Sequence, residues 1–528
     1  MTFFSKIIFL TFLSSLLISC AGNGITKENY SKASLNQPDL NEYLVPIKPG
    51  VPKKQAFWNI YSKQFMYAPA FDFKVVDNAV EYEFIASDAD SKKYLFKEDK
   101  PWAALSPIWN KLPIGYIDLE VFGIDNKGSR LKHSGTRKFY KAAGFNGPYN
   151  KRVMDYGESA KKALAYLYNK AHFQNWLTNA LPDTNYRFYC YPSKIIGAVV
   201  ESMILYSFLS PHDSAQAIQI AKNAADYLIS ISEPENSPIA YFPPTYMWEI
   251  LSAKDYKDQF MLIYPSDVAL NYLDLYDITN NKKYFNAAVK IADTYRRLQL
   301  PSGTWKLKLW KNGSPVKDND CIPVNIIILM ERLSTQYKIN VYESCAKDGF
   351  NWIMNNPVVT YYWSGQFEDI DPGVRYKNLT KHDACSFAIY LLEKENVSED
   401  HISLAEELLS FSEDQFVVWE KPMPHIYSRA QNWILPCVLE QYDYYVPIDA
   451  SVSKLMETYS TAYKVTGKEL YYLKAVELAN AMTVAQIEET GRYPTYWERN
   501  ERRDLNEGWI NCATYDAKVM LKMKAFKK

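Results

Sequence analysis

The segment TNNKKYFNAAVKIADTYRRLQLPSGTW, residues 279–305, decides the fold, because the segment TGKELYYLKAVELANAMTVAQIEETGRYP, residues 466–494, repeats its pattern. Each segment has a turn, then a helical stretch with alanines four residues apart, then a loop with glycine and an aromatic residue. Small residues at that spacing lie on one helix face and allow a neighbouring helix to approach closely. Recurrence of such a unit is typical of a repeat architecture.

Weaker copies of the helical stretch are centred on Ala160, Ala217, Ala346 and Ala405. Successive copies lie roughly 55 to 70 residues apart, which is room for two helices of about 11 or 12 residues and two loops. Six helical hairpins form either an open solenoid or a closed ring, and an open array needs polar capping repeats. The chain shows no such caps, so we predict a mostly α fold with an (α/α)6 toroid; an irregular all-helical domain is the alternative.

The first twenty residues predict a bacterial lipoprotein signal peptide. Lys6 precedes an apolar run over 7–17 that is too short to span a bilayer, and Leu17-Ile-Ser-Cys20 precedes small residues. We therefore predict a signal peptide over 1–20, lipidation of Cys20 and a linker over 21–55, with an ordinary secretory signal as the alternative. The expected location is a lipid anchor in the outer membrane, on the periplasmic side.

Residues 56–143 alternate apolar and polar side chains with a period of two. Val80-Glu-Tyr-Glu-Phe-Ile and Tyr116-Ile-Asp-Leu-Glu-Val-Phe-Gly are the clearest stretches, and Asp125-Asn-Lys-Gly128 is a turn. This pattern predicts a small antiparallel β-sandwich, and the stretch around it resembles a fibronectin type III module. The pattern becomes helical afterwards, so we assign 144–528 to the toroid and to catalysis.

The composition argues against a nucleic-acid partner and limits the chemistry expected of the chain. The chain has 60 Lys plus Arg and 60 Asp plus Glu residues, so it has no net positive charge of the kind that favours binding of nucleic acid. Tyrosine is abundant, at 42 residues, which suits sugar-binding surfaces as well as packing. Six cysteines follow Cys20 with irregular spacing and no metal-binding pattern, so we expect buried free thiols. We predict no cofactor and no metal ligand, with a divalent cation and the oligomeric state left open.

His382 is the sharpest candidate for a general base. It is one of six histidines and lies between Lys381 and Asp383 at the start of an apolar helix. A neighbouring cation and a helix N-terminus lower the pKa of an imidazole and keep it neutral near pH 7. In the structural alternative, Asp383 or Thr380 caps the helix and His382 is a solvated residue of its first turn.

Glu368 and Asp369 form a carboxyl pair, the group that glycoside hydrolysis requires. Adjacent residues do not normally face each other in the required geometry, so a structural role for one of them is the alternative. Trp363 precedes them beside Gly365 and is a candidate for binding sugar.

Arg187 and Arg492 are each surrounded by tyrosines, an arrangement that suits bidentate binding of a sugar carboxylate or sulfate. Lys194 follows Arg187 at the start of a helix and adds a second cation. Either arginine can instead form a salt bridge at the edge of the core.

Three tyrosines complete the candidate site. Tyr246 follows two prolines that fix an extended backbone, and Tyr191 and Tyr496 lie in the arginine-containing loops. Removal of the proton α to a uronate carboxylate requires a base, a group that neutralises the carboxylate, and often a phenol that protonates the leaving oxygen. With this many tyrosines, chance clustering is the competing interpretation.

A lipidated β-module followed by Thr466-Gly-Lys-Glu-Leu-Tyr471 repeats and the loop Gln299-Leu-Pro-Ser-Gly-Thr-Trp305 resembles the toroidal carbohydrate-active proteins of Bacteroidetes polysaccharide utilisation loci. The whole chain resembles, in particular, the oligosaccharide dehydratases of ulvan-degrading loci. The resemblance implies polysaccharide degradation, with an acidic oligosaccharide as partner. It implies no particular catalytic residue.

The sequence leaves three hypotheses for the function of the protein. The leading hypothesis is a lyase or dehydratase that acts by β-elimination on uronic-acid-containing, ulvan-like oligosaccharides, with His382 as base, Tyr246 as acid and Arg187 or Arg492 as the carboxylate clamp. The second is a hydrolase of the unsaturated glucuronyl type, with Glu368 or Asp369 as acid and base. The third is a glycan-binding lipoprotein without catalysis.

Overall fold

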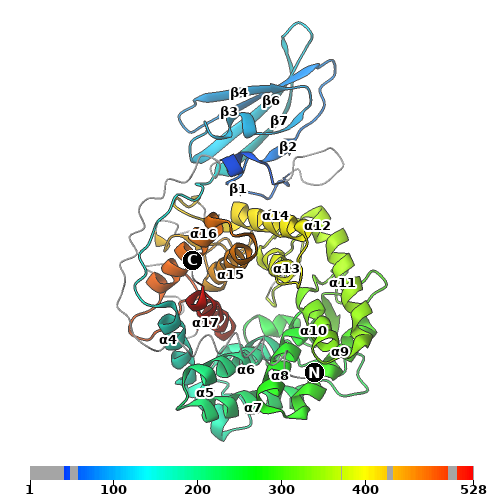
Figure 1. Cartoon of the computed structure of the whole chain (residues 1–528). Coiled ribbons are helices and arrows are strands. Elements are labelled where there is room, and N and C mark those ends of the chain that lie inside the picture. Colours follow the sequence, from blue (N-terminus) through cyan, green and yellow to red (C-terminus); the bar gives the residue numbers. More distant parts are fainter. Residues whose placement is uncertain (1–40, 48–57, 370–371, 425–431, 498–507, 527–528) are drawn as a thin grey trace.

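The computed structural model describes residues 41–47, 58–369, 372–424, 432–497 and 508–526. The predicted signal peptide and the lipidation site Cys20 lie outside these residues. The described part contains a β-rich module followed by a ring of helices, with the module at one edge of the ring (Figure 1).

In the described part of the chain, twelve long helices alternate between two layers of the ring. The inner layer contains α6 (Pro192–Leu209), α8 (Tyr264–Thr279), α10 (Val324–Thr335), α13 (His382–Leu392), α15 (Asp449–Thr466) and α17 (Ile510–Ala525). The outer layer contains α4 (Tyr156–Tyr168), α7 (Ser214–Ile231), α9 (Lys282–Leu298), α11 (Glu343–Asn355), α14 (Glu399–Phe416) and α16 (Glu469–Ala485).

The ring closes between its two ends in the sequence. Each inner helix packs against the next, from α6 through α8, α10, α13 and α15 to α17, and α17 returns to pack on α6. Five inner helices form a hairpin with the outer helix that follows them, and α17 packs against α4, the first helix of the ring. The predicted (α/α)6 toroid is therefore confirmed, and the helix at the end of the chain completes it (Figure 1).

The repeat in the sequence corresponds to the outer layer. Its six alanines lie one on each outer helix and are all buried. Outer helices have one buried and one exposed face, so their apolar residues recur with a clear period. The inner helix α6 is apolar on most sides and largely buried, so its apolar residues show no clear period. The inner helices are therefore not recognisable as a repeat in the sequence.

Turn residues end and begin these helices where the sequence indicates. Gly467 ends α15 with φ of +68°, a conformation that costs glycine little. Asn280 ends α8 in the same left-handed region, and the Asn281 side chain caps α9 by accepting a hydrogen bond from Lys283 N. The two quoted segments thus share a turn because each separates an inner helix from its outer partner.

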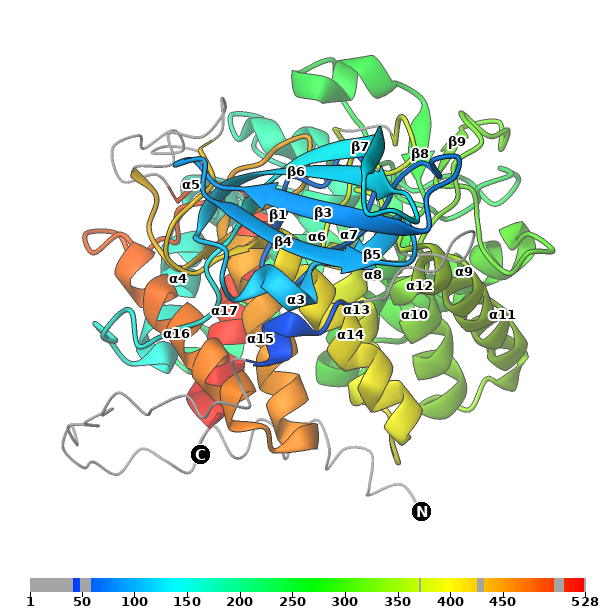
Figure 2. The ribbon, with the colours of Figure 1, turned by 90° about the horizontal axis from the view of Figure 1, so that it is seen from above.

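The strands of the β-module lie within residues 64–141. The sheet strands are β1 (Gln64–Phe65), β3 (Glu81–Ser87), β4 (Lys93–Glu98), β6 (Gly115–Ile124) and β7 (Arg130–Lys141), in the order β1-β7-β6-β3-β4. All neighbours are antiparallel except β1 and β7. A separate antiparallel ribbon joins β2 (Ala70–Asp72) to β5 (Trp102–Ala104). The fibronectin type III arrangement is not confirmed, because one five-stranded sheet accompanies only this short ribbon; Figure 2 shows the sheet over the ring.

Short elements connect the main ones. They are α3 (Ser106–Trp109), α5 (Ala171–Thr178), α12 (Pro357–Thr360), the 3-10 helices η1 (Glu42–Leu44), η2 (Arg187–Cys190), η3 (Leu251–Tyr256) and η4 (Asn340–Tyr342), and the two-stranded ribbons of β8 (Gln259–Met261) with β9 (Lys308–Trp310) and of β10 (Val417–Val418) with β11 (Cys437–Val438).

Two further expectations concern buried groups. All six cysteines after Cys20 are buried and none forms a disulfide, as predicted. Among the described residues, α6 has the length and hydropathy of a membrane span, but most of it is buried and it packs against α7, α8 and α17.

Candidate functional site

The end of the ring at which the inner helices begin is called the mouth here. Each outer helix runs back alongside its inner partner, so all six inner helices run in the same direction and begin at this end. The N-terminus of a helix carries a partial positive charge and unpaired N–H groups. The mouth therefore concentrates six positive helix ends, and the loops between helices place side chains there.

Glu368 is the buried centre of the mouth. Lys194, in the first turn of α6, donates from Nζ to Glu368 Oε1 at 2.5 Å, and Tyr264, the first residue of α8, donates from its hydroxyl to Oε2 at 2.6 Å. The Glu368 side chain is 2% exposed. Burial opposes its ionisation, but the Lys194 ammonium and these hydrogen bonds outweigh burial and lower the pKa of Glu368. Glu368 is therefore a carboxylate with both oxygens engaged.

Asp369 has the opposite environment. The residue is exposed, yet desolvation of its carboxyl by the surrounding protein and then the negative charge of Glu368 raise the pKa of Asp369 to about 6. Two neighbouring carboxyls with pKa values moved in opposite directions are the arrangement that separates an acid from a charged partner. Of the pair predicted from the sequence, Asp369 fits an acid and Glu368 fits a positioning group.

Glu440 supplies a further carboxyl near this pair. It lies between β11 and α15 and is half-buried. Burial raises the pKa of Glu440 to about 7; the charge of Lys381 opposes this rise, and the charges of Asp369 and Glu368 add to it. The sequence analysis missed Glu440, although the aromatic stretch Gln441-Tyr-Asp-Tyr-Tyr445 beside it was a usable signal.

Lys381 fixes the loop that carries Glu440. Its Nζ donates to the main-chain oxygens of Leu439 at 2.8 Å and Glu440 at 2.9 Å, and also contacts Ser451 Oγ. Burial lowers the pKa of Lys381, while the charge of Glu440 raises it. Lys381 directly precedes α13, so the start of an inner helix holds the loop in place.

The β-module braces this same part of the mouth. Ser62 Oγ lies 3.1 Å from Tyr442 Oη, and Lys63 Nζ donates to the Tyr442 main-chain oxygen at 3.4 Å. Gln64 and Gln415 exchange two hydrogen bonds between side-chain amides and main-chain oxygens. The residues just before β1 thus contact the loop two residues beyond Glu440, and β1 contacts the end of α14.

Aromatic side chains line one side of Glu368. Tyr246 is buried and donates its hydroxyl to the Glu368 main-chain oxygen at 2.7 Å. Its ring lies edge-on to Tyr191 at 6.2 Å and stacks on Tyr256 at 5.1 Å. Tyr191 in turn stacks on Trp509 at 5.8 Å, and Lys194 Nζ lies 4.4 Å from the centre of the Trp509 ring. The structure therefore brings together the predicted Tyr191, Lys194, Tyr246 and Glu368.

His382 lies at the mouth as the first residue of α13, with a side chain 48% exposed. Its Nδ1 lies 3.3 Å from Asp383 Oδ1, and its main-chain N–H donates to Thr380 Oγ1 at 3.3 Å. Desolvation is the largest cause and lowers the pKa of His382, while the hydrogen bond with Asp383 opposes it. The charges of Lys454 and Lys381 lower the pKa further by smaller amounts. The direction of this shift keeps the imidazole neutral near pH 7, but its main cause is desolvation rather than the neighbouring lysine proposed from the sequence.

The other predicted residues differ in burial. Trp363 is fully buried and packs on Phe387, so its ring has no exposed face in this structure. Arg492 is 3% exposed and packs beside Gly508, and Arg187 is exposed on η2. The roles of Arg187 and Arg492 as a clamp for a sugar carboxylate stay a prediction.

Tyr496 is the last of the predicted residues. It is half-buried and lies edge-on to Tyr444 at 6.1 Å. Because Tyr444 follows Glu440 by four residues, this contact places Tyr496 on the Glu440 side of the mouth. Burial raises the pKa of Tyr496. Tyr264, which binds Glu368, was missed because its only local signal is its position at the start of a helix.

The side chains of the described residues offer no evident metal site. Within the described ranges, no group of three or more His, Cys, Asp or Glu side chains is arranged to hold a metal ion. The charges at the mouth are instead balanced by Lys194 and Lys381.

Comparison with known proteins finds no matching protein-family model and no matching curated protein. Solved structures resemble the chain at low identity. A family 76 glycoside hydrolase from a bovine Bacteroides thetaiotaomicron strain shares 11% identity over 86% of this chain and 95% of its own, with a TM-score of 0.48. A cellobiose 2-epimerase from Spirochaeta thermophila shares 11% over 70% and 98%, with a TM-score of 0.46. An unsaturated glucuronyl hydrolase from Streptococcus agalactiae shares 12% over 71% and 94%, with a TM-score of 0.45.

Proposed function

We propose that this protein is a carbohydrate-active enzyme that hydrolyses a glycosidic bond by general acid and base catalysis at the mouth of the ring. The observation that carries the proposal is the exposed Asp369, whose pKa is raised to about 6 beside the ionised and fully engaged Glu368. A carboxylic acid with such a pKa is protonated at mildly acidic pH and transfers a proton near neutrality.

The proposed roles follow from access and protonation. Asp369 donates its proton to the glycosidic oxygen as the bond to the anomeric carbon breaks. Water adds to the anomeric carbon, and Glu440 accepts its proton, so that one water is consumed and a new reducing end forms. Glu368 does not act as the acid, because both of its oxygens are occupied by Lys194 and Tyr264; its charge keeps the proton on Asp369.

The substrate class proposed is an acidic oligosaccharide, with ulvan-like uronate chains as the first to test. Lys194 and Lys308 both lie close enough to Asp369 to lower its pKa, and six helix N-termini face the same region. Cations and helix N-termini favour a carboxylate or sulfate on the bound sugar. The aromatic side chains around Tyr246 supply surfaces for sugar rings.

The decisive test uses saturated and unsaturated uronate oligosaccharides, with ultraviolet absorbance and mass spectrometry as readouts. Hydrolysis adds the mass of one water to the products and creates a reducing end without a new chromophore. Asp369→Asn, with the similarly sized amide, is the matched variant. Binding without any change in mass would contradict the proposal and favour the glycan-binding alternative.

β-Elimination is the second candidate, and His382 is the observation that favours it. The imidazole is about half exposed at the same mouth and neutral near pH 7, as a general base must be. Elimination breaks a C–O bond after loss of the proton α to the carboxylate, so it creates a double bond that absorbs in the ultraviolet. It takes second place because Tyr246, the predicted acid, already donates its hydroxyl to the Glu368 main-chain oxygen.

We also propose that Cys20 is lipidated and anchors the protein to the outer membrane on the periplasmic side. Metabolic labelling with a fatty acid tests this directly. We expect label on the parent chain and none on Cys20→Ala, and label on both chains would contradict the assignment.

A further inference from the structure

A hollow of about 490 Å³ lies between the end of α4 and the loop that follows α16. Its lining residues are Lys162, Ala165, Tyr166, Asn169, Lys170, Glu488, Glu489, Thr490 and Gly491. None of them belongs to the proposed catalytic group. We propose that this hollow is an outer subsite that binds a sugar unit of a glycan chain; the class of ligand rests on the proposed function, whereas the site rests on its own geometry.

The hollow opens on the same end of the ring as the mouth. Outer helices run opposite to inner ones, so α4 and α16 end where the inner helices begin. The loop after α16 continues from the hollow to the mouth, where the Thr495 main-chain oxygen accepts from Asp449 N at the start of α15. A chain that occupies both places can therefore run along one face of the protein.

The wall of the hollow is rigid on the loop side. Gly491 has φ of +76° and lies so close to α4 that a Cβ there would come within 2.7 Å of the Lys162 Cβ. Its main-chain N–H donates to Ile487 at 2.7 Å, and the Gln486 amide donates to its carbonyl oxygen at 2.6 Å. A wall held in this way needs little ordering when a ligand binds.

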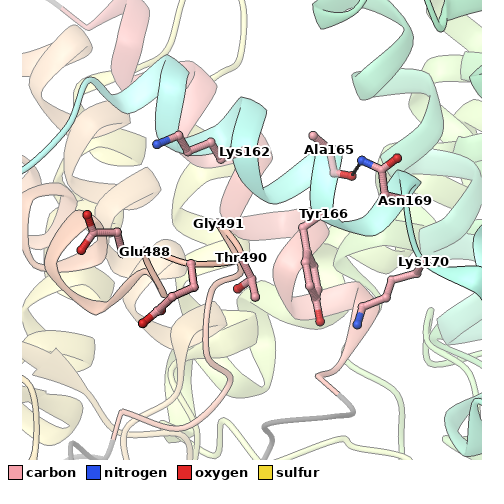
Figure 3. A pocket seen from close by; sticks show the side chains of 9 residues that line it. Lys162, Ala165, Tyr166, Asn169, Lys170, Glu488, Thr490 and Gly491 are labelled. Atoms are coloured by element: carbon pink, nitrogen blue, oxygen red, sulfur yellow. Dashed lines mark hydrogen bonds between the residues drawn. The ribbon is translucent and has the colours of Figure 1, made fainter.

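The lining chemistry suits a sugar. Tyr166 is half-buried and offers a ring, and Lys170 Nζ lies 4.3 Å from the centre of that ring. Figure 3 shows Tyr166, on α4, and Lys170, just before α5, on the side of the hollow that faces the loop of Glu488 and Thr490. A single ring edged by ammonium, carboxylate, amide and hydroxyl groups matches the apolar face and the hydroxyls of a sugar, whereas a lipid or apolar ligand needs a more continuous apolar lining.

Native gel electrophoresis in the presence of ulvan, alginate, heparin or α-mannan tests the subsite, because glycan binding slows migration. All variants carry Asp369→Asn, so that turnover does not consume the glycan. We expect Tyr166→Ala to weaken the apparent affinity about three- to tenfold, the range expected for loss of an aromatic contact. Tyr166→Phe, which keeps the ring, should retain most of the affinity.

Lys162→Ala should weaken retardation, and Lys161→Ala is the matched control because Lys161 is exposed on the same helix but does not line the hollow. Unchanged retardation of Tyr166→Ala, equal effects of the two lysine variants, or no retardation of the parent protein in any of the gels would overturn the subsite. Retardation that depends on Tyr166, in a protein without turnover of any glycan, would support the subsite and refute the proposed hydrolysis.

Discussion

Two buried lysine–glutamate pairs lie in this protein, one where the β-module meets the ring and one at the mouth. Lys474 on α16 pairs with Glu413 on α14 at 2.7 Å, and Lys194 pairs with Glu368 at 2.5 Å. The lysine is fully buried in the first pair and 15% exposed in the second. The same ion pair therefore occurs in a sealed setting and in one that borders exposed groups.

The surroundings of the two pairs explain the difference. Glu413 also accepts hydrogen bonds from Tyr67 at 3.0 Å and Trp419 at 2.9 Å, and the neighbouring Asp414 accepts from the main-chain N–H groups of Met66 and Tyr67. These contacts join the module to the ring and leave no carboxyl facing outward. At the mouth, the exposed Asp369 follows the paired glutamate directly. The fully buried pair Lys474–Glu413 therefore joins the β-module to the ring, whereas the partly exposed pair Lys194–Glu368 lies beside an exposed carboxyl, that of Asp369.

Asp369→Asn is expected to give the largest effect, on activity alone. Removal of a general acid lowers kcat/KM by about 10²- to 10⁴-fold. The residue is exposed, so the free energy of unfolding should hardly change. Steady-state kinetics on the best oligosaccharide, with urea denaturation of the same preparation, measures both. A loss of activity matched by a loss of stability would remove the proposed catalytic role.

Lys474→Met tests the sealed pair. It leaves Glu413 charged and buried without its partner, which destabilises the protein by about 3–5 kcal/mol. Urea denaturation gives the free energy of unfolding. The double variant Lys474→Met/Glu413→Gln removes both charges and should recover much of the loss; no recovery would show that packing of the lysine stem, rather than the ion pair, sets the stability.

Lys194→Met is the matched change at the mouth, and we expect a smaller loss of about 1–3 kcal/mol. Lys194 is partly exposed, and Tyr264 still donates to Glu368 after the substitution. The same denaturation experiment compares the two variants. If Lys194→Met costs as much as Lys474→Met, the two pairs are equally sealed and the comparison fails.

The pH dependence of activity follows from Asp369 and Glu440. The pKa of Asp369 is raised to about 6, and it must be protonated to act as the acid. The pKa of Glu440 is raised to about 7, and Glu440 must be ionised to act as the base. The profile of kcat/KM should therefore be bell-shaped, highest between about pH 6 and 7, and should fall about tenfold per unit on either side. A rate profile from pH 4 to 8 tests this. Activity that stays constant from pH 4 to 6 would contradict the role of Glu440 as the base.

His382→Ala should have the smallest effect if hydrolysis is correct. The imidazole then has no step to perform, and kcat/KM should change by less than about threefold, well below the loss typical for a general base. His382→Gln, which retains polarity, is the control for local packing. A loss of a hundredfold or more in both variants, with a new ultraviolet chromophore, would favour β-elimination.

Most of the fold was predictable because its signals are local. The alanine spacing of the outer helices and the period-two stretches of the strands reflect burial on one face of each element. The inner helix α6, buried on most sides, has no comparable period, and the fibronectin-like arrangement depended on strand pairing that the period does not specify.

The site was less predictable, because its contacts join distant loops. Glu368 meets Lys194 across 174 positions and Tyr264 across 104. Glu440 joins them only because α13 and α15 are neighbours in the closed ring. Trp363 looked available beside two carboxyls, yet packing against Phe387 buries it.

The sequence by itself determined which segments form helices and strands, that six hairpins follow a β-module, and that Glu368, Asp369 and Lys194 are chemically suited to a site. The tertiary structure decided that α17 closes the ring on α4, which carboxyl is engaged and which is exposed, and that Glu440 belongs with them. The reason is physical: periodic burial is encoded within one element, whereas the pKa of a carboxyl depends on charges and desolvation that only folding brings together.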